Sequence, residues 1–134
     1  MRKNYLKKII AQSPNDLQII SAYCSESKVK IEDIKYLPSS KIFLLSLSRS
    51  NKEQEEEKII NSVIKFEFIE SSKSKNIDQS NIDKELELLA IDVFKRDKNF
   101  EITLLFSKNR IITLTAEVIE ATLEDQKLLN DKNN

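Results

Sequence analysis

The first quarter of the chain carries apolar residues at helical spacing. The segment 13–16 (SPND) supplies a capping serine, a proline suited to a first helical turn and an aspartate that closes a weak capping box. Leu17, Ile20 and Cys24 then recur at i, i+3 and i+7. This pattern predicts a three-turn amphipathic helix, preceded by a short extended segment over 5–11.

From residue 28 the hydrophobic period changes to two, which is typical of strands. Residues 29–31 and 34–36 alternate on opposite parities, so we expect a bulge or break at 32–33. The segment 38–41 (PSSK) predicts a turn, and 42–49 (IFLLSLSR) predicts a strong strand. Together these segments predict a hairpin.

Further strands are predicted by the same alternation in the second half of the chain. They lie at 59–69, 86–94, 100–106 and 111–118, with a tight hairpin turn at 107–110 in which Asn109 supplies a positive φ. The inward-facing set includes Ile64, Phe66, Phe68, Phe100, Ile102, Leu104, Phe106, Ile112, Leu114, Ala116 and Val118.

Three segments lack a clear period. Residues 51–58 predict a charged connection, and 70–85 (ESSKSKNIDQSNIDKE) predict a long mobile loop within the domain. Beyond Val118 the pattern is ambiguous, because residues 119–128 fit either a continued strand or a C-terminal helix, and 132–134 should fray.

These elements predict one α+β domain over residues 1–134. Its core would be an antiparallel meander sheet of about six strands packed on one N-terminal helix. Strands with one apolar and one polar face indicate a sheet solvated on one side, or one strongly curved into a half-barrel around the helix.

The composition excludes several classes of enzyme. The 134 residues include no glycine and no histidine, where an average chain of this length would have about nine glycines. A glycine-rich phosphate loop, an imidazole general base and an ordinary zinc site are therefore ruled out. The bias toward lysine, isoleucine and asparagine is typical of an AT-rich genome, which accounts for part of the missing glycine.

Charge and cysteine content restrict partners and compartment. Basic and acidic residues balance at 22 each, so net charge gives no attraction to nucleic acid or to an anionic membrane. A single cysteine excludes an intrachain disulfide, and no apolar run is long enough to span a bilayer. We expect a cytoplasmic protein with no cofactor and no metal.

Most candidates for chemistry have a structural explanation. Cys24 lies on the apolar helix face without a histidine to activate it, which favours a core residue. The acidic run 53–57 lacks the spacing of a cation loop, which favours a charged surface. Strand carboxylates could act in pairs as in glycoside hydrolysis, but their alternation with lysine and threonine favours a solvated face; they are Glu67, Glu70, Asp92, Glu117 and Glu120.

One weaker cluster points to binding. Tyr36, Arg49 and Arg110 lie near strand ends, and arginine is scarce here, with four among the 22 basic residues. An arginine retained under this bias could hold a carboxylate or phosphate with two hydrogen bonds, which lysine does poorly. The alternative for each arginine is a structural ion pair.

The order of several short motifs resembles a bacterial family, domain of unknown function 2948. The similarity covers nearly the whole chain, and it departs where the family often has glycine in the last hairpin and tryptophan at the position of Tyr36. Because the family has no assigned activity, the resemblance implies a single domain and adds no chemistry. The residues that carry it are Leu6, Ile10, Ala11, Asp16, Leu17, Ile31, Asp33, Ile34, Tyr36, Leu37 and Pro38.

Two functions of different classes remain. The first is a non-catalytic binding or protein-interaction module that presents a sheet face, a sheet edge or the 70–85 loop to a partner protein or to its own copy. The alternative is a histidine-free enzyme or small-molecule binder that uses carboxylates and arginine. The alternative requires a deep pocket with carboxylates beside Arg49, Arg96 or Arg110.

Overall fold

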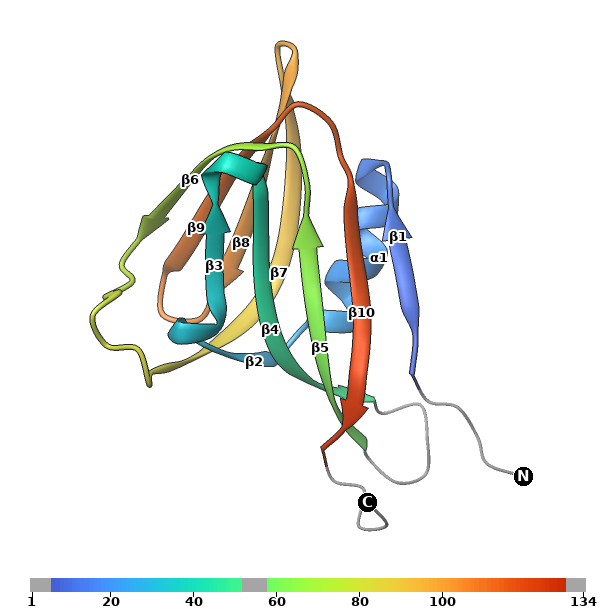
Figure 1. Ribbon diagram of the computed structural model, residues 1–134, viewed down its shortest axis with the longest axis vertical. Coiled ribbons are helices and arrows are strands. Elements are labelled where there is room, and N and C mark those ends of the chain that lie inside the picture. Colours follow the sequence, from blue (N-terminus) through green and yellow to red (C-terminus); the bar gives the residue numbers. More distant parts are fainter. Residues whose placement is uncertain (1–5, 52–57, 130–134) are drawn as a thin grey trace.

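A computed structural model describes residues 6–51 and 58–129 (Figure 1). One helix packs on an antiparallel sheet of ten strands that is not closed, so the α+β class is confirmed and the expected six strands understate the sheet. The elements are β1 Lys8–Ala11, α1 Pro14–Cys24, β2 Ser27–Lys30, η1 Ile31–Asp33, β3 Ile34–Leu37, η2 Pro38–Ser40, β4 Ile42–Asn51, β5 Lys58–Phe66, β6 Ile69–Lys75, β7 Glu85–Arg96, β8 Asn99–Phe106, β9 Arg110–Ala116 and β10 Ala121–Leu128, where η marks a single 3₁₀ turn. Within the described part, the helix is too short to cross a membrane.

The predicted helix is confirmed, with a modified cap. The Ser13 hydroxyl accepts the Asp16 backbone N–H at 3.1 Å, and the Asp16 carboxylate accepts the N–H of Gln12, one residue before the expected partner. Leu17 and Ile20 are fully buried, and α1 packs mainly on β7 and β1. The apolar stripe read from the sequence therefore faces the core.

The meander prediction is only partly correct. The strand order is β1-β10-β5-β4-β2-β7-β8-β9-β6, with β3 paired to β4 beside this path. Sequential neighbours pair at β3–β4–β5 and β7–β8–β9, but β10 lies between β1 and β5. The short β2 pairs with both β4 and β7, so it joins two groups of strands into one sheet.

The expected break at 32–33 is the 3₁₀ turn η1. The predicted 70–85 loop is wrong over its first part, because β6 runs to Lys75 and pairs with β9. Its polar sequence hid the strand, since an available sheet edge decides strand formation more than intrinsic propensity does. The connection from β6 to β7, residues 76–84, keeps the predicted turn character.

The expected strand over 59–69 ends at Phe66, and two residues predicted to face inward do not. Phe68 has φ 61° and is 44% exposed. This left-handed residue breaks the alternation between β5 and β6. Val118 is 46% exposed because β9 ends at Ala116 and the chain turns before β10. The other inward positions are buried or half-buried.

The ambiguous C-terminal segment is a strand. β10 pairs with β5 from Ala121 to Leu128 and with β1 from Ala121 to Glu124. Two partners fix its backbone hydrogen bonds, which favours the strand over a helix. The predicted charge run at 53–57 and the predicted fraying at 132–134 lie outside the described residues.

Left-handed turns form here without glycine. Asn109 has φ 59°, as predicted for the β8–β9 turn, and Lys108 before it has φ 62°. Such residues pay a steric penalty that glycine avoids, although asparagine and aspartate tolerate this region better than most. The remaining positive-φ residues in the described chain are Glu26, Lys41, Phe68, Asn76 and Asp97.

A buried ion pair crosses one end of the otherwise apolar core. Arg49 follows Phe43, Leu45 and Leu47 on the inward face of β4 and is 1% exposed. Its Nε and Nη2 atoms donate to the two carboxylate oxygens of Asp125 on β10, at 3.0 and 2.6 Å. This two-bond geometry is the strong form of the arginine–carboxylate pair.

Several elements complete this ion pair. The Ser62 hydroxyl on β5 donates to Asp125 at 2.6 Å, and the Lys7 backbone N–H donates to it at 2.8 Å. The Tyr23 ring of α1 lies 5.4 Å from the Arg49 guanidinium. Burial alone would raise the pKa of the Asp125 carboxyl, but these hydrogen bonds and the Arg49 charge outweigh it and hold that pKa below its ordinary value.

We expect Arg49→Met to lower the free energy of unfolding by about 3–5 kcal/mol, because it leaves the Asp125 carboxylate buried without its partner. The double variant Arg49→Met/Asp125→Leu should lose less than the single one. Urea unfolding of each variant measures this. Arg96→Ala is the control, since the Arg96–Glu101 pair is exposed and should contribute under about 1 kcal/mol. If Arg49→Met and Arg96→Ala lost equal free energy of unfolding, Arg49 would not be part of a stabilising buried ion pair.

The ion pair also predicts a dependence on pH. Because the pKa of Asp125 is depressed in the folded state, its stabilising effect is complete above the ordinary aspartate pKa of about 3.9 and is lost as pH falls through the folded value. The wild-type thermal midpoint should therefore fall more steeply on acidification than that of Arg49→Met/Asp125→Leu. Parallel curves for the two proteins would contradict this.

Candidate functional site

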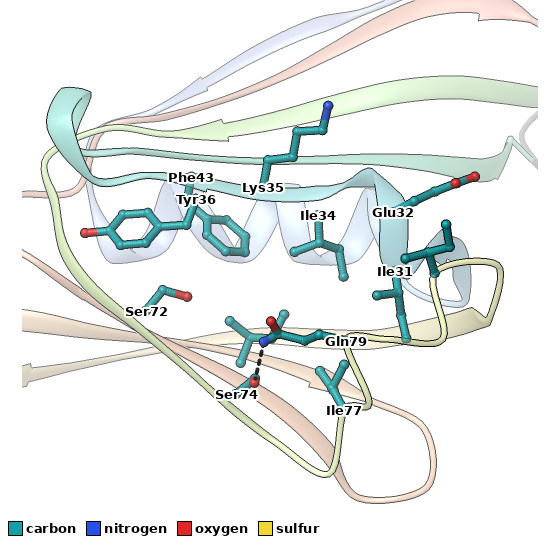
Figure 2. Close-up of a pocket in the computed structure, with 12 residues that line it drawn as sticks. Ile31, Glu32, Ile34, Lys35, Tyr36, Phe43, Ser72, Ser74, Ile77 and Gln79 are labelled. Atoms are coloured by element: carbon teal, nitrogen blue, oxygen red, sulfur yellow. Dashed lines mark hydrogen bonds between the residues drawn. The ribbon is translucent and has the colours of Figure 1, made fainter.

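A cavity of about 540 Å³ lies between β3, β6 and the 76–84 connection, and we call it the β3–β6 cavity. Its volume is within the usual range of ligand sites, about 300–1,000 Å³. Figure 2 shows β3 side chains facing β6 side chains across it. The lining residues are Ile31, Glu32, Ile34, Lys35, Tyr36, Phe43, Ser72, Ser74, Ile77, Gln79, Ile82 and Ile112.

Two strand edges border this cavity. Among the strands that the structure describes, β3 pairs only with β4 and β6 only with β9. The free edges meet at one end, where the Tyr36 hydroxyl donates to the Ile69 carbonyl at 3.0 Å and the Ile69 N–H donates to the Lys41 carbonyl at 2.8 Å. The Lys41 ammonium adds an exposed ion pair to Glu70 at 3.1 Å.

Beyond this junction the two edges separate. The register of β6 on β9 shifts between Ile69 and Ser71, and such irregularities bend a strand. At the far end the 76–84 connection closes the cavity: the Ile31 and Glu32 N–H groups donate to the carbonyls of Lys84 and Ile82 at 3.0 and 3.1 Å. The cavity is thus bounded at both ends by backbone hydrogen bonds.

The lining has an apolar floor and a polar side. Phe43 and Ile112 are 2% and 3% exposed and belong to the main core. The polar side is formed by Ser72 and Ser74 of β6 with Gln79, whose side-chain amide donates to the Ser74 hydroxyl at 3.2 Å (Figure 2). Apolar walls with a few placed polar groups are typical of ligand-binding sites.

The structure separates the three predicted binding residues. Tyr36 lines the cavity and joins its two strands. Arg49 lies in the buried ion pair with Asp125, which agrees with the structural alternative for this residue. Arg110 is half-buried at the start of β9 and forms no ion pair with the described residues. Sequence reasoning missed Ser72, Ser74 and Ile77, which lie in the segment read as a loop.

The catalytic alternatives find little support in the described residues. Burial raises the pKa of the Cys24 thiol to about 12, so the thiolate needed for nucleophilic attack is scarce. Of the strand carboxylates, Glu70 and Glu117 converge on Lys41, and Glu67 lies 4.0 Å from Lys65. These contacts agree with a solvated, ion-paired face.

A wider hollow of about 700 Å³ lies beside Arg49 and is lined by Glu26, Glu85 and Glu87. It has the composition that an enzyme using carboxylates and arginine would need. However, Arg49 is 1% exposed and already holds Asp125, and Glu87 lies 3.6 Å from Lys28. Arg49 therefore has a structural role, as one half of the buried ion pair. No group of three or more acidic or cysteine side chains in the described chain is placed to hold a metal ion.

The structure defines an α+β protein with an open antiparallel sheet and a cavity between two of its strand edges. The chain belongs to the family of proteins of unknown function DUF2948, whose model matches residues 7–132. The resemblance noted from the sequence motifs is thereby confirmed. Comparisons with curated proteins and with solved structures find no match.

Tyr36→Phe tests the junction at the end of the cavity. Loss of the hydroxyl leaves the Ile69 carbonyl without this donor, so we expect about 1 kcal/mol of destabilisation and faster amide hydrogen exchange at the start of β6. Exchange measured by NMR checks this, with Tyr23→Phe as the control. Unchanged exchange in β6 would show that the hydroxyl does not hold the two strands together.

Proposed function

We propose that this protein is a non-catalytic binding module that takes up an extended segment of a partner protein in the β3–β6 cavity. The observation that carries the proposal is a pair of strand edges, those of β3 and β6, that no other described strand occupies and that lie on either side of an apolar floor. A strand edge offers backbone N–H and C=O groups that another chain can pair with. Recognition of a peptide by strand addition uses this same chemistry.

The arrangement of the sheet supports an extended occupant. The start of β6 lies at the end of β3, through the Tyr36–Ile69 bond, while Ser74 and Ile77 line the same cavity as Ile31 and Ile34. The two edges therefore run in opposite directions, and a strand between them would be antiparallel to one and parallel to the other. Such a strand would bridge the open side of the sheet between β3 and β6.

A small amphipathic molecule is the second candidate. The volume of the cavity, about 540 Å³, and its mixture of isoleucine with hydroxyl and amide groups would suit one. A small molecule leaves most of the strand-edge N–H groups without partners, whereas a peptide pairs with them. Backbone protection along both β3 and β6 thus separates the two candidates. Two expectations from the sequence stay predictions. One is the cytoplasmic location, and the other is that the bound segment belongs to a partner protein or to a second copy of this chain.

Selection from a random peptide display library tests the proposal. Ser74→Trp fills the cavity from β6, and Thr103→Trp, on the outer face of β8, is the control because Thr103 does not line the cavity. We expect peptides selected on the wild type to bind Thr103→Trp with similar affinity and Ser74→Trp at least about tenfold more weakly, a loss of about 1.4 kcal/mol.

Hydrogen exchange of the bound complex completes this test. The β3 and β6 amides should become protected together, because both edges contact the inserted strand. Selected peptides that bind Ser74→Trp as tightly as wild type would place the binding surface elsewhere. Failure to select any peptide, with a small amphipathic compound protecting only the cavity floor, would favour the second candidate.

A further inference from the structure

We infer that the segment bound in the β3–β6 cavity alternates apolar with acidic residues, apolar side chains inward and carboxylates outward. This inference rests on the proposed function and names the chemistry of the partner. It is carried by the lysines on the outer face of the two free edges: Lys35 on β3, and Lys73 and Lys75 on β6.

The direction of these lysines follows from strand geometry. Successive side chains of a strand point to opposite faces. Because Ser72 and Ser74 line the cavity, Lys73 and Lys75 point to the opposite, solvent side, and both are exposed. Lys35 borders the cavity, and Figure 2 shows that its side chain extends away from the β6 side chains.

The three lysines are available to a partner. Each is exposed, and none forms an ion pair with another residue in the described ranges 6–51 and 58–129. Some other strand lysines are paired, as Lys8 is to Glu124 and Lys28 to Glu87. A strand lying between β3 and β6 would bring its outward residues beside these ammonium groups, where opposite charges directly across a strand pair are favourable.

The same charges disfavour a second copy as the occupant. Lysines on edge strands are a common protection against edge-to-edge association. If the β3 or β6 edge of one molecule met the same edge of another, lysine would face lysine. An acidic strand is attracted to these lysines, a basic strand is repelled by them, and an uncharged strand gains no attraction. The inward positions need apolar residues because Phe43 and Ile112 form the floor.

Three synthetic peptides with blocked ends test the inference. Each is as long as β6 and alternates valine with glutamate, serine or lysine. Fluorescence anisotropy at low salt should show the glutamate peptide binding about tenfold more tightly than the serine peptide and the lysine peptide weakest. Added salt should reduce these differences, since exposed charges are screened.

Charge-reversed proteins give the decisive comparison. Lys35→Glu/Lys73→Glu/Lys75→Glu should transfer the preference to the lysine peptide, and Lys73→Glu alone should weaken glutamate-peptide binding in case the triple variant does not fold. The control Lys95→Glu/Lys98→Glu/Lys127→Glu has the same net charge but leaves the cavity edges intact, and it should keep the wild-type preference.

The outcomes separate this inference from the proposed function. If the three peptides bind equally and Ser74→Trp abolishes all binding, the cavity binds strands but the acidic preference is wrong. If none binds, the inference is also wrong, and the display selection decides the proposed function by itself. Concentration-dependent dimerisation that Ser74→Trp abolishes would assign the cavity to a second copy and overturn the inference.

Discussion

The buried pair of Arg49 and Asp125 is the interaction on which the packing of β1, β10, β5 and β4 depends. It joins β4 to β10 directly, and through Ser62 and the Lys7 backbone it includes β5 and the chain entering β1. A charge pair of this kind tolerates only one register, because a slip of one residue would turn the arginine or the aspartate to the opposite face. Arg49 on β4 and Asp125 on β10 both occupy inward positions, and their pairing thus specifies the register of β10 against β5.

That pair also shows how far the sequence can predict this fold. The alternation of Phe43, Leu45 and Leu47 places Arg49 on the inward face, so its burial follows from period two alone. Asp125 could not be found in this way, because the apolar run before it, Ala121 and Leu123, is too short to separate strand from helix. The partner of a buried arginine depends on the tertiary structure, because it is set by pairing between segments far apart in the chain.

The candidate site was harder to predict for a related reason. The Ser72-Lys73-Ser74-Lys75 segment alternates, but with no apolar residue to mark an inward face, and its strand state comes from the edge that β9 provides. Tyr36, a binding candidate from the sequence, lines the cavity, while its neighbours across the cavity lie in a segment that the sequence predicts as a loop. Local patterns thus gave the β3 side of the site and tertiary pairing the β6 side.

The cavity arises because the consecutive strands β2 and β3 pair with different neighbours. β2 pairs with β7, and after the single turn η1 the chain continues as β3 on the same side of β4 but without β7. The outer edge of β3 is then left facing β6, which a register shift bends away beyond Ile69. Because backbone pairing rather than side-chain size opens this space, a larger side chain such as tryptophan at Ser74 can fill it without altering the strand order. A chain segment that pairs with both edges would complete the hydrogen bonding that the topology leaves unfinished, which is why we propose an extended occupant rather than a compact one.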